Sequence, residues 1–212
     1  MAKNLEEPHD RSDFFKSLGT LMAGFMAARV EDAVTGAGPS LLRPPGALDE
    51  FDFLLACTRC DKCIKACPQD SILPAGPGAA LAHGTPHILP RNMPCFLCTS
   101  LPCIPACPEG ALVWPKRKVG EEELEGPPAV RMGLARIKRR LCLTWEHEDE
   151  PAQPCTTCVD RCPYPGKAIR MGEPAEGQLP HPEVIADFCT GCGLCTFGCP
   201  SPNPAIVVDP RD

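Results

Sequence analysis

The fold of this 212-residue chain is decided by the stretch Cys189-Thr190-Gly191-Cys192-Gly193-Leu194-Cys195-Thr196-Phe197-Gly198-Cys199-Pro200. Its spacing, C-x2-C-x2-C-x3-C-P, is that of a loop that wraps a four-iron, four-sulfur cube. We expect the first three thiolates to hold three irons of one cube and the fourth to point at a neighbouring cube. Gly191 and Gly193 allow the backbone to approach closely, so that amide N–H groups can face the sulfides.

Three further variants of this motif precede it, and the four motifs span residues 57–68, 95–108, 142–163 and 189–200. The second lengthens the middle interval to four residues, and the third separates Cys142 from Cys155 by twelve residues. The alternative for Cys142 alone is a small buried residue, which would leave the ligands one short of four [4Fe-4S] clusters. The predicted ligands are all sixteen cysteines of the chain: Cys57, Cys60, Cys63, Cys67, Cys95, Cys98, Cys103, Cys107, Cys142, Cys155, Cys158, Cys162, Cys189, Cys192, Cys195 and Cys199.

The composition indicates that an ordinary apolar core cannot stabilise this chain alone, so disulfides or bound metal must contribute. Aromatic residues make up 5% of it, whereas prolines number 27 and glycines 18, so large apolar side chains are scarce. Eight disulfides are one alternative, but two cysteines three apart in a turn rarely meet without strain. Zinc is commonly bound by C-x2-C pairs, but a zinc site does not require a third and a fourth cysteine at these spacings. Iron–sulfur clusters therefore fit the cysteine pattern better than either.

Two segments of different character make up the chain. Residues 1–47 are predicted to form an N-terminal helix and a proline- and glycine-rich linker, because apolar residues recur at helical spacing between residues 14 and 34. The apolar part of this helix is too short to span a bilayer, so we expect it to dock on a partner or to lie on a membrane face. Residues 48–212 are predicted to form the four-cluster domain.

Local patterns predict a few elements of this domain. Residues 48–56 are expected to form a short helix before the first motif, and residues 86–90 an extended segment. Residues 116–126 are charged and carry no apolar period, which predicts an exposed loop. Apolar residues then alternate over residues 130–137, as in a strand.

An internal repeat predicts the fold class. Each Cys-Pro is followed within a few residues by a small residue and an aliphatic run, at residues 71–73, 111–113, 168–171 and 205–208. Each unit is therefore expected to be a loop, one helical turn and a short strand. Two such units facing each other make a two-cluster ferredoxin body. The predicted fold is thus small, irregular α+β, with two ferredoxin-like halves in tandem behind an N-terminal helix.

The chain resembles the ferredoxin-type electron-transfer proteins of the NapG/MauM type, which are linked to periplasmic nitrate reductase and methylamine utilisation. The features that carry the resemblance are Leu42-Arg43-Pro44-Pro45-Gly46-Ala47, the longer interval with Pro102 in the second motif, and the divided third motif. They cover roughly residues 42–208. More broadly, the chain is similar to the four-cluster electron-transfer subunits of molybdenum oxidoreductases.

The broader resemblance implies that the first and fourth motifs share two clusters and that the second and third share the other two. The implied ligand sets are Cys57, Cys60, Cys63 with Cys199; Cys189, Cys192, Cys195 with Cys67; Cys95, Cys98, Cys103 with Cys162; and Cys142, Cys155, Cys158 with Cys107. Spacing alone leaves sequential pairing open, in which the first motif pairs with the second and the third with the fourth.

The resemblance implies a relay of single electrons between a quinol- or ferredoxin-linked donor and a partner oxidoreductase. Ligation by cysteine alone leaves no open iron site, so we expect no catalysis by this chain itself. The alternative is an iron–sulfur subunit, or an assembly scaffold, of an oxidoreductase complex whose catalysis lies on another chain. The formal charge of −6 argues against nucleic acid as a partner.

Members of this family usually begin with a twin-arginine export signal. Here the corresponding residues 10–16 keep Phe14, Phe15 and Lys16 but have Ser12 in place of the second arginine. We therefore expect a cytoplasmic protein, with residues 14–34 as the segment that could associate with a membrane face; the alternative is a periplasmic protein exported by a degenerate signal.

Other candidate residues are weaker. His83 and His87 stand four apart and are expected to belong to an ordinary surface loop rather than to a metal site. His181 is expected to be exposed and Trp145 to be a core aromatic. The basic run at residues 136–140 is expected to be a solvated face, or else a surface that steers an acidic partner.

Overall fold

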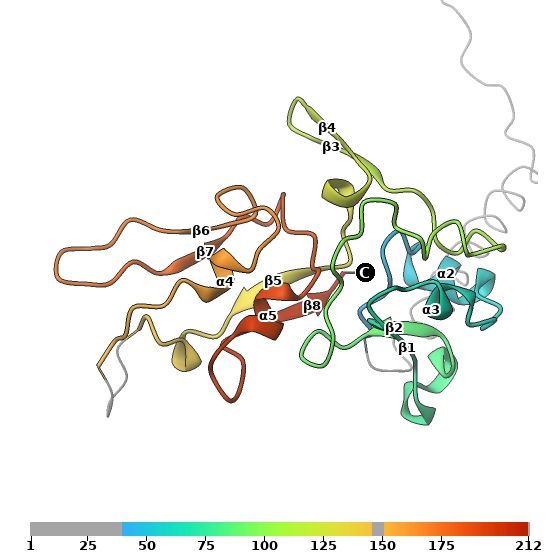
Figure 1. The fold of residues 1–212 in the computed structure, drawn as a ribbon, viewed down its shortest axis with the longest axis horizontal. Helices are drawn as coiled ribbons and strands as arrows, with labels where there is room; N and C mark the ends of the chain where they lie inside the picture. The colour runs from blue at the N-terminus through green and yellow to red at the C-terminus, as the bar shows by residue number, and fades with distance from the viewer. Residues whose placement is uncertain (1–39, 146–150, 212) are drawn as a thin grey trace, which may run out of the picture.

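The computed structural model describes residues 40–145 and 151–211 (Figure 1). The helices in these ranges are short: α2 (Glu50–Ala56), α3 (Lys62–Lys65), α4 (Thr157–Asp160) and α5 (Leu194–Gly198), with 3₁₀ turns η1 (Pro77–Ala82), η2 (Pro127–Ala129) and η3 (Arg139–Leu141). None of the helices in the described ranges has the length and apolar character needed to cross a membrane. The predicted helix over residues 14–34 and the linker up to residue 39 lie outside the described residues.

The strands pair as four separate antiparallel ribbons rather than as one sheet. They are β1 (Ile72–Pro74) with β2 (Pro86–Ile88), β3 (Lys116–Val119) with β4 (Glu122–Glu125), β5 (Gly133–Ile137) with β8 (Ile206–Pro210), and β6 (Ile169–Met171) with β7 (Pro182–Val184). The prediction of a small fold of mixed helix and sheet is confirmed. The tandem ferredoxin-like arrangement stays a prediction at this point.

Local predictions succeeded where an apolar pattern supported them. The helix expected at residues 48–56 is α2, whose Phe53 is fully buried and whose first turn carries Glu50 and Asp52, acids that suit a helix N-terminus. The extended segment at residues 86–90 contains β2, and the strand expected over residues 130–137 is β5. These segments each combine a clear apolar pattern with a turn signal nearby.

The prediction of an exposed loop at residues 116–126 is wrong, because this segment is the β3–β4 hairpin. Gly120, with φ +59°, makes the tight turn. Oppositely charged residues face each other across the strands, and Lys116 forms a salt bridge with Glu125 at 2.9 Å. Leu124 is the one side chain of the two strands that is buried, so the sequence shows no apolar alternation.

Three of the four aliphatic runs after the Cys-Pro pairs are strands, namely those in β1, β6 and β8. The run at residues 111–113 is not. It forms only an isolated bridge between Leu112 and Ala47, together with a hydrogen bond from Val113 N to Gly46 O at 2.7 Å. The segment at residues 42–47 thus takes the place of a partner strand.

Two large hydrophobic cores hold the described chain, beside a small cluster of Ala75, Ala79 and Ala82. One contains Phe53, Ile88, Leu101 and Val130 and is built almost entirely from residues before β5. The other contains Ile169 and Ile206, which pack with residues from β5 onward. Figure 1 shows the corresponding lobes, with β1, β2, α2 and α3 on one side and α4 to α5 with β5 to β8 on the other.

Candidate metal centres

Four hollows in the described chain are each lined by four cysteines. Their empty spaces are similar, at about 370, 360, 340 and 360 Å³ including the part open to solvent. We name them by position along the chain. Hollow A is lined by Cys57, Cys60, Cys63 and Cys107; hollow B by Cys67, Cys95, Cys98 and Cys103; hollow C by Cys162, Cys189, Cys192 and Cys195; and hollow D by Cys142, Cys155, Cys158 and Cys199.

This grouping overturns the pairing that the molybdenum-oxidoreductase resemblance implied. Each hollow takes three cysteines from one motif and the fourth from its neighbour in sequence, so the first motif pairs with the second and the third with the fourth. Cys199 joins hollow D rather than the first motif, and Cys107 joins hollow A rather than the third. The reason is packing: the first two motifs share one hydrophobic core, and the third and fourth motifs pack largely in the other.

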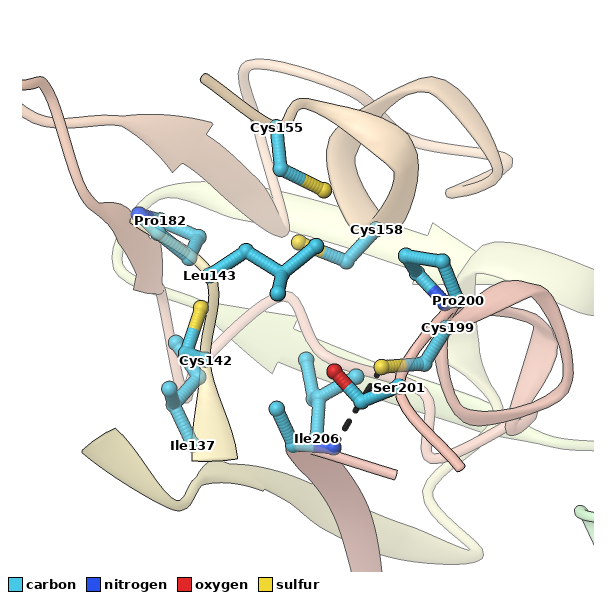
Figure 2. Close-up of a pocket in the computed structure, with 11 residues that line it drawn as sticks. Ile137, Cys142, Leu143, Cys155, Cys158, Pro182, Cys199, Pro200, Ser201 and Ile206 are labelled. Carbon is cyan, nitrogen blue, oxygen red and sulfur yellow. Dashed lines mark hydrogen bonds between the residues drawn. The ribbon is translucent and has the colours of Figure 1, made fainter. Parts of the chain in front are cut away.

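Hollow D shows how the local structure places the thiols (Figure 2). Cys142 follows η3, Cys155 and Cys158 lie at the start of α4, and Cys199 directly follows α5. The four sulfurs face one space, with Ile206 of β8 beside it. The inclusion of Cys142, despite the long insertion after it, agrees with its prediction as a member of the third motif.

Backbone amides point at cysteine sulfurs in hollows B, C and D as well as in hollow A, where Lys62 and Ile64 act on Cys60 and Cys63. The N–H groups of Ser71, Leu97, Ala135 and Ala205 donate to the sulfurs of Cys67, Cys95, Cys189 and Cys199, with N···S distances of 3.4, 3.5, 3.4 and 3.3 Å respectively. Donors of this kind stabilise negative charge on sulfur. Ser71, Ala168 and Ala205 begin the aliphatic runs, so the repeat places a small residue where the chain passes close to a hollow.

Burial makes several of these thiols weak acids in the protein alone. It raises the pKa of Cys63 to about 11, of Cys95 and Cys158 to about 12, and of Cys162 to about 11, and neighbouring thiolates add to the rise. Such thiols are protonated at neutral pH, so a bound metal must displace their protons. Cys60 differs: it is exposed, and the backbone N–H of Lys62 lowers its pKa.

The residues fit an iron–sulfur cube better than a single ion. In the described ranges no three cysteine, histidine, aspartate or glutamate side chains meet closely enough to hold one metal ion. The four thiols of a hollow instead surround a space, and amides approach their sulfurs. A [4Fe-4S] cube has its four irons at separate corners, each needing one thiolate.

The two lobes touch directly between hollows B and C. The N–H of Cys95 donates to the carbonyl oxygen of Cys192 at 2.9 Å, and Met132 N donates to Thr190 O at 2.9 Å. Within the second lobe, a Cβ on Gly191 would lie 2.3 Å from the backbone nitrogen of Gly133 in β5, so only glycine allows the last motif to pack this close to β5.

Arg91 adds a side-chain link between the lobes that sequence reasoning missed. Its guanidinium donates to the carbonyl oxygens of Thr196 at 3.2 Å, Cys199 at 3.0 Å and Ser201 at 3.3 Å. These carbonyls belong to the C-terminal end of α5 and the turn after it, where a cation is favourable. Nothing in the local sequence around Arg91 signals this role.

The other candidate residues are placed as follows. His87 is buried in β2, where Nδ1 lies 2.9 Å from Leu73 O, whereas His83 is exposed, so they form no joint site. The expectation of a surface loop was therefore wrong for His87. His181 stacks on Trp145 with ring centroids 4.0 Å apart, a contact the sequence did not predict.

The basic run at residues 136–140 is exposed, as expected for a solvated face. Arg136 pairs with Asp209 at 2.6 Å, and the guanidinium of Arg139 lies 5.8 Å from the Trp145 ring.

The fold and the four thiol-lined hollows define a ferredoxin-type iron–sulfur protein. A family model described as a 4Fe-4S binding domain matches residues 180–201, which include the first three cysteines of the last motif and Cys199. No solved structure matches the chain.

Curated relatives extend over most of the chain. The methylamine utilization ferredoxin-type protein MauM of Methylorubrum extorquens is 36% identical over 91% of this chain and 83% of its own length. The ferredoxin-type protein NapG of Escherichia coli is 35% identical over 93% and 83%, and MauM of Paracoccus denitrificans 35% over 90% and 81%. The chain belongs to this NapG/MauM family of ferredoxin-type proteins, and the expectation of an iron–sulfur electron-transfer protein is confirmed at that level.

Proposed function

We propose that the chain binds four [4Fe-4S] clusters in hollows A to D and passes single electrons from a donor to a partner oxidoreductase. Each cluster, when bound, supplies one reversible electron. All sixteen cysteines serve as ligands in the sets that line the hollows, and residues 48–212 form two ferredoxin-like halves. No side chain of the described residues is assigned a catalytic role.

The observation that carries this proposal is that the hollows are adjacent in the order A, B, C, D. Cys63 of hollow A lies near enough to Cys103 of hollow B to affect its pKa, and Cys158 of hollow D does the same to Cys195 of hollow C. Cys95 of hollow B lies similarly close to Cys192 of hollow C, to which its amide is hydrogen-bonded. Protein groups therefore connect each hollow to the next in this order, including across the boundary between the lobes.

The chain's own residues prepare this route in two ways. Eight of the sixteen cysteines are buried and only Cys60 is exposed, which limits the access of water to the sulfurs, and amide donors stabilise charge on them. Hollow A differs because Cys60 is exposed, in the company of the exposed Arg59 and Asp61. We propose that hollow A is the end at which a redox partner exchanges electrons.

The partners are proposed from the relatives. Proteins named for methylamine utilization and a NapG ferredoxin-type protein are similar to this chain over most of its length. We propose a quinol- or ferredoxin-linked donor and an oxidoreductase acceptor, with catalysis on the acceptor.

The test is a count of iron and sulfide per chain, followed by a redox titration monitored by EPR. About sixteen irons and sixteen sulfides, with signals that reduce at potentials accessible to cellular donors, are expected. Fewer irons would overturn the four-cluster assignment. A full complement of clusters that no cellular donor can reduce would overturn the relay and favour a structural role in assembling another enzyme.

A further inference from the structure

The largest of the cavities described here is not one of the thiol-lined hollows. It has about 1020 Å³ of empty space, including its open mouth, and no cysteine lines it. Its walls come from most of residues 43–50, from residues 113–117 at the start of the β3–β4 hairpin, and from Ala129, Arg131, Met132 and Arg211. The Leu42–Ala47 stretch, one of the features that marks the family, therefore has a place that iron–sulfur binding does not explain.

Five cationic side chains line this cavity, and two of them are already neutralised. Arg43 pairs with Glu50 and also donates to Thr85 Oγ1 at 2.8 Å. Lys116 pairs with Glu125 across the hairpin. The other three are Arg117, Arg131 and Arg211.

The three remaining arginines gather on one side without a carboxylate ion pair among the described residues. Arg117 is held by the carbonyl oxygens of Ala129 and Pro128, both at 3.2 Å, and of Asp187. Burial lowers the pKa of Arg117 and Arg211, and the positive charge of Arg131 lowers both further. Three positive charges thus lie near one another at the wall of an open cavity, where the charge of Asp187 partly offsets Arg117 and Arg211 and the exposed Asp49 also lines the wall.

Two of these arginines have donors left over. Arg211 donates through Nη2 to Ala186 O at 2.9 Å, but its Nη1 is buried and has no hydrogen-bond partner in the described part of the chain. Arg131 is exposed and has no hydrogen-bond or ion-pair partner within residues 40–145 and 151–211. A buried guanidinium N–H without an acceptor is costly.

We propose that this cavity binds an oxyanion, the phosphate or carboxylate group of a small molecule, between Arg131 and Arg211. The planar guanidinium fork matches both groups and can donate two hydrogen bonds to either. The positive charge of Arg117 adds to the attraction for an anion at this wall of the cavity. The exposed indole of Trp114, which is 40% exposed, offers an apolar wall to the rest of such a molecule.

The test measures binding of inorganic phosphate and, separately, of citrate to the cluster-loaded full-length chain by calorimetry at low ionic strength. Sodium chloride at matched ionic strength is the reference, because screening alone weakens charge effects. We expect saturable binding of at least one of the two anions, and the comparison between them tells a phosphate site from a carboxylate site. No saturable binding of either anion to the full-length chain overturns the proposal, including the case in which another part of the chain fills the cavity.

Arg131→Gln is the decisive variant, because Arg131 has no structural partner among the described residues and the change should leave the fold intact. We expect the dissociation constant to rise about ten-fold or more, the usual effect of losing a charge-assisted hydrogen bond. Arg131→Lys keeps the positive charge but lacks the planar guanidinium group, so its dissociation constant should lie between those of the unmodified chain and Arg131→Gln. Arg140→Gln removes an exposed arginine outside the cavity and should bind like the unmodified chain. Equal loss in Arg131→Gln and Arg140→Gln would show a net-charge effect and reject the site.

Discussion

The backbone N–H of Cys95 donates to the carbonyl oxygen of Cys192 at 2.9 Å, so a thiol-bearing residue of hollow B is hydrogen-bonded to one of hollow C. This bond joins the two lobes between hollow B and hollow C. Cys192 also packs in the hydrophobic core of the first lobe, although its motif belongs to the second. The last motif therefore packs against the first lobe. Its thiols nevertheless line hollows C and D of the second lobe.

The grouping of thiols predicts which site a cysteine substitution damages. Cys199→Ser should damage hollow D, although Cys142, Cys155 and Cys158 lie in a different motif. The iron content should fall by up to about four atoms per chain, and the EPR signal that is lost should match the one lost in Cys155→Ser. Cys162→Ser is the matched control and should instead damage hollow C. Loss of the signal that depends on Cys57 would contradict the sequential grouping.

The close approach of the last motif to β5 predicts a strong effect at one glycine. Gly191 has φ +72°, and a Cβ there would lie 2.3 Å from Gly133 N, against backbone that cannot move aside cheaply. Gly191→Ala should therefore destabilise the chain by more than the roughly 1–2 kcal/mol that a left-handed conformation costs an alanine. Thermal unfolding, followed by the loss of the visible absorbance of the clusters, compares the stability of this variant with that of the unmodified chain.

Gly177→Ala is the control for that substitution. Gly177 has φ +75°, but nothing lies within 4 Å of a Cβ built on it. Gly177→Ala should therefore lose only the free energy that the left-handed backbone conformation costs an alanine. Equal effects of the two changes would mean that the contact with Gly133 does not constrain the loop.

Sequence patterns predicted the features that depend on residues close together in the sequence. They did not predict contacts that depend on how distant segments of the chain pack together. A spacing of three residues brings Cys189, Cys192 and Cys195 around one volume whatever the rest of the fold does. Which cube Cys199 reaches depends on where a motif tens of residues away is packed, and no local spacing records that. The charged β3–β4 hairpin was missed for a related reason, because its strands are held by cross-strand charge pairs and not by an apolar face.

The arginines were missed because their partners are backbone carbonyls. Arg91 reaches the turn after α5 more than a hundred residues away, and Arg211 reaches the segment that enters the last motif. A carbonyl oxygen carries no residue identity, so the sequence gives no sign of such contacts.

Arg91 is predicted to hold the last motif against the first lobe. Arg91→Gln removes donors from the carbonyl oxygens of Thr196, Cys199 and Ser201, and should destabilise the chain by about 1.5–3 kcal/mol, the range for a hydrogen bond to a charged group. It should also speed the loss of iron to a chelator from hollow D, which Cys199 lines.

Arg59→Gln is the comparison for Arg91. Arg59 also donates to carbonyl oxygens, those of Leu81 and His83, both at 3.0 Å, but within the first lobe. It should leave hollow D unaffected. Faster iron loss from hollow D in Arg59→Gln as well would mean that Arg91 acts only through general stability.

His87 predicts how stability changes with pH. Burial lowers its pKa from 6.5, the positive charge of Arg43 lowers it further, and the hydrogen bond to Leu73 O opposes the change. Because a carbonyl can only accept, the neutral ring donates from Nδ1. As the pH falls below about 6.5, the unfolded chain takes up this proton before the folded chain does, so stability falls until the lower folded pKa is reached. Thermal unfolding between pH 7.5 and about 5 should therefore show a loss in the unmodified chain that His87→Gln lacks. The exposed His83 provides the control, since His83→Gln should keep the loss; a loss of the same size in His87→Gln would assign the pH dependence to other groups.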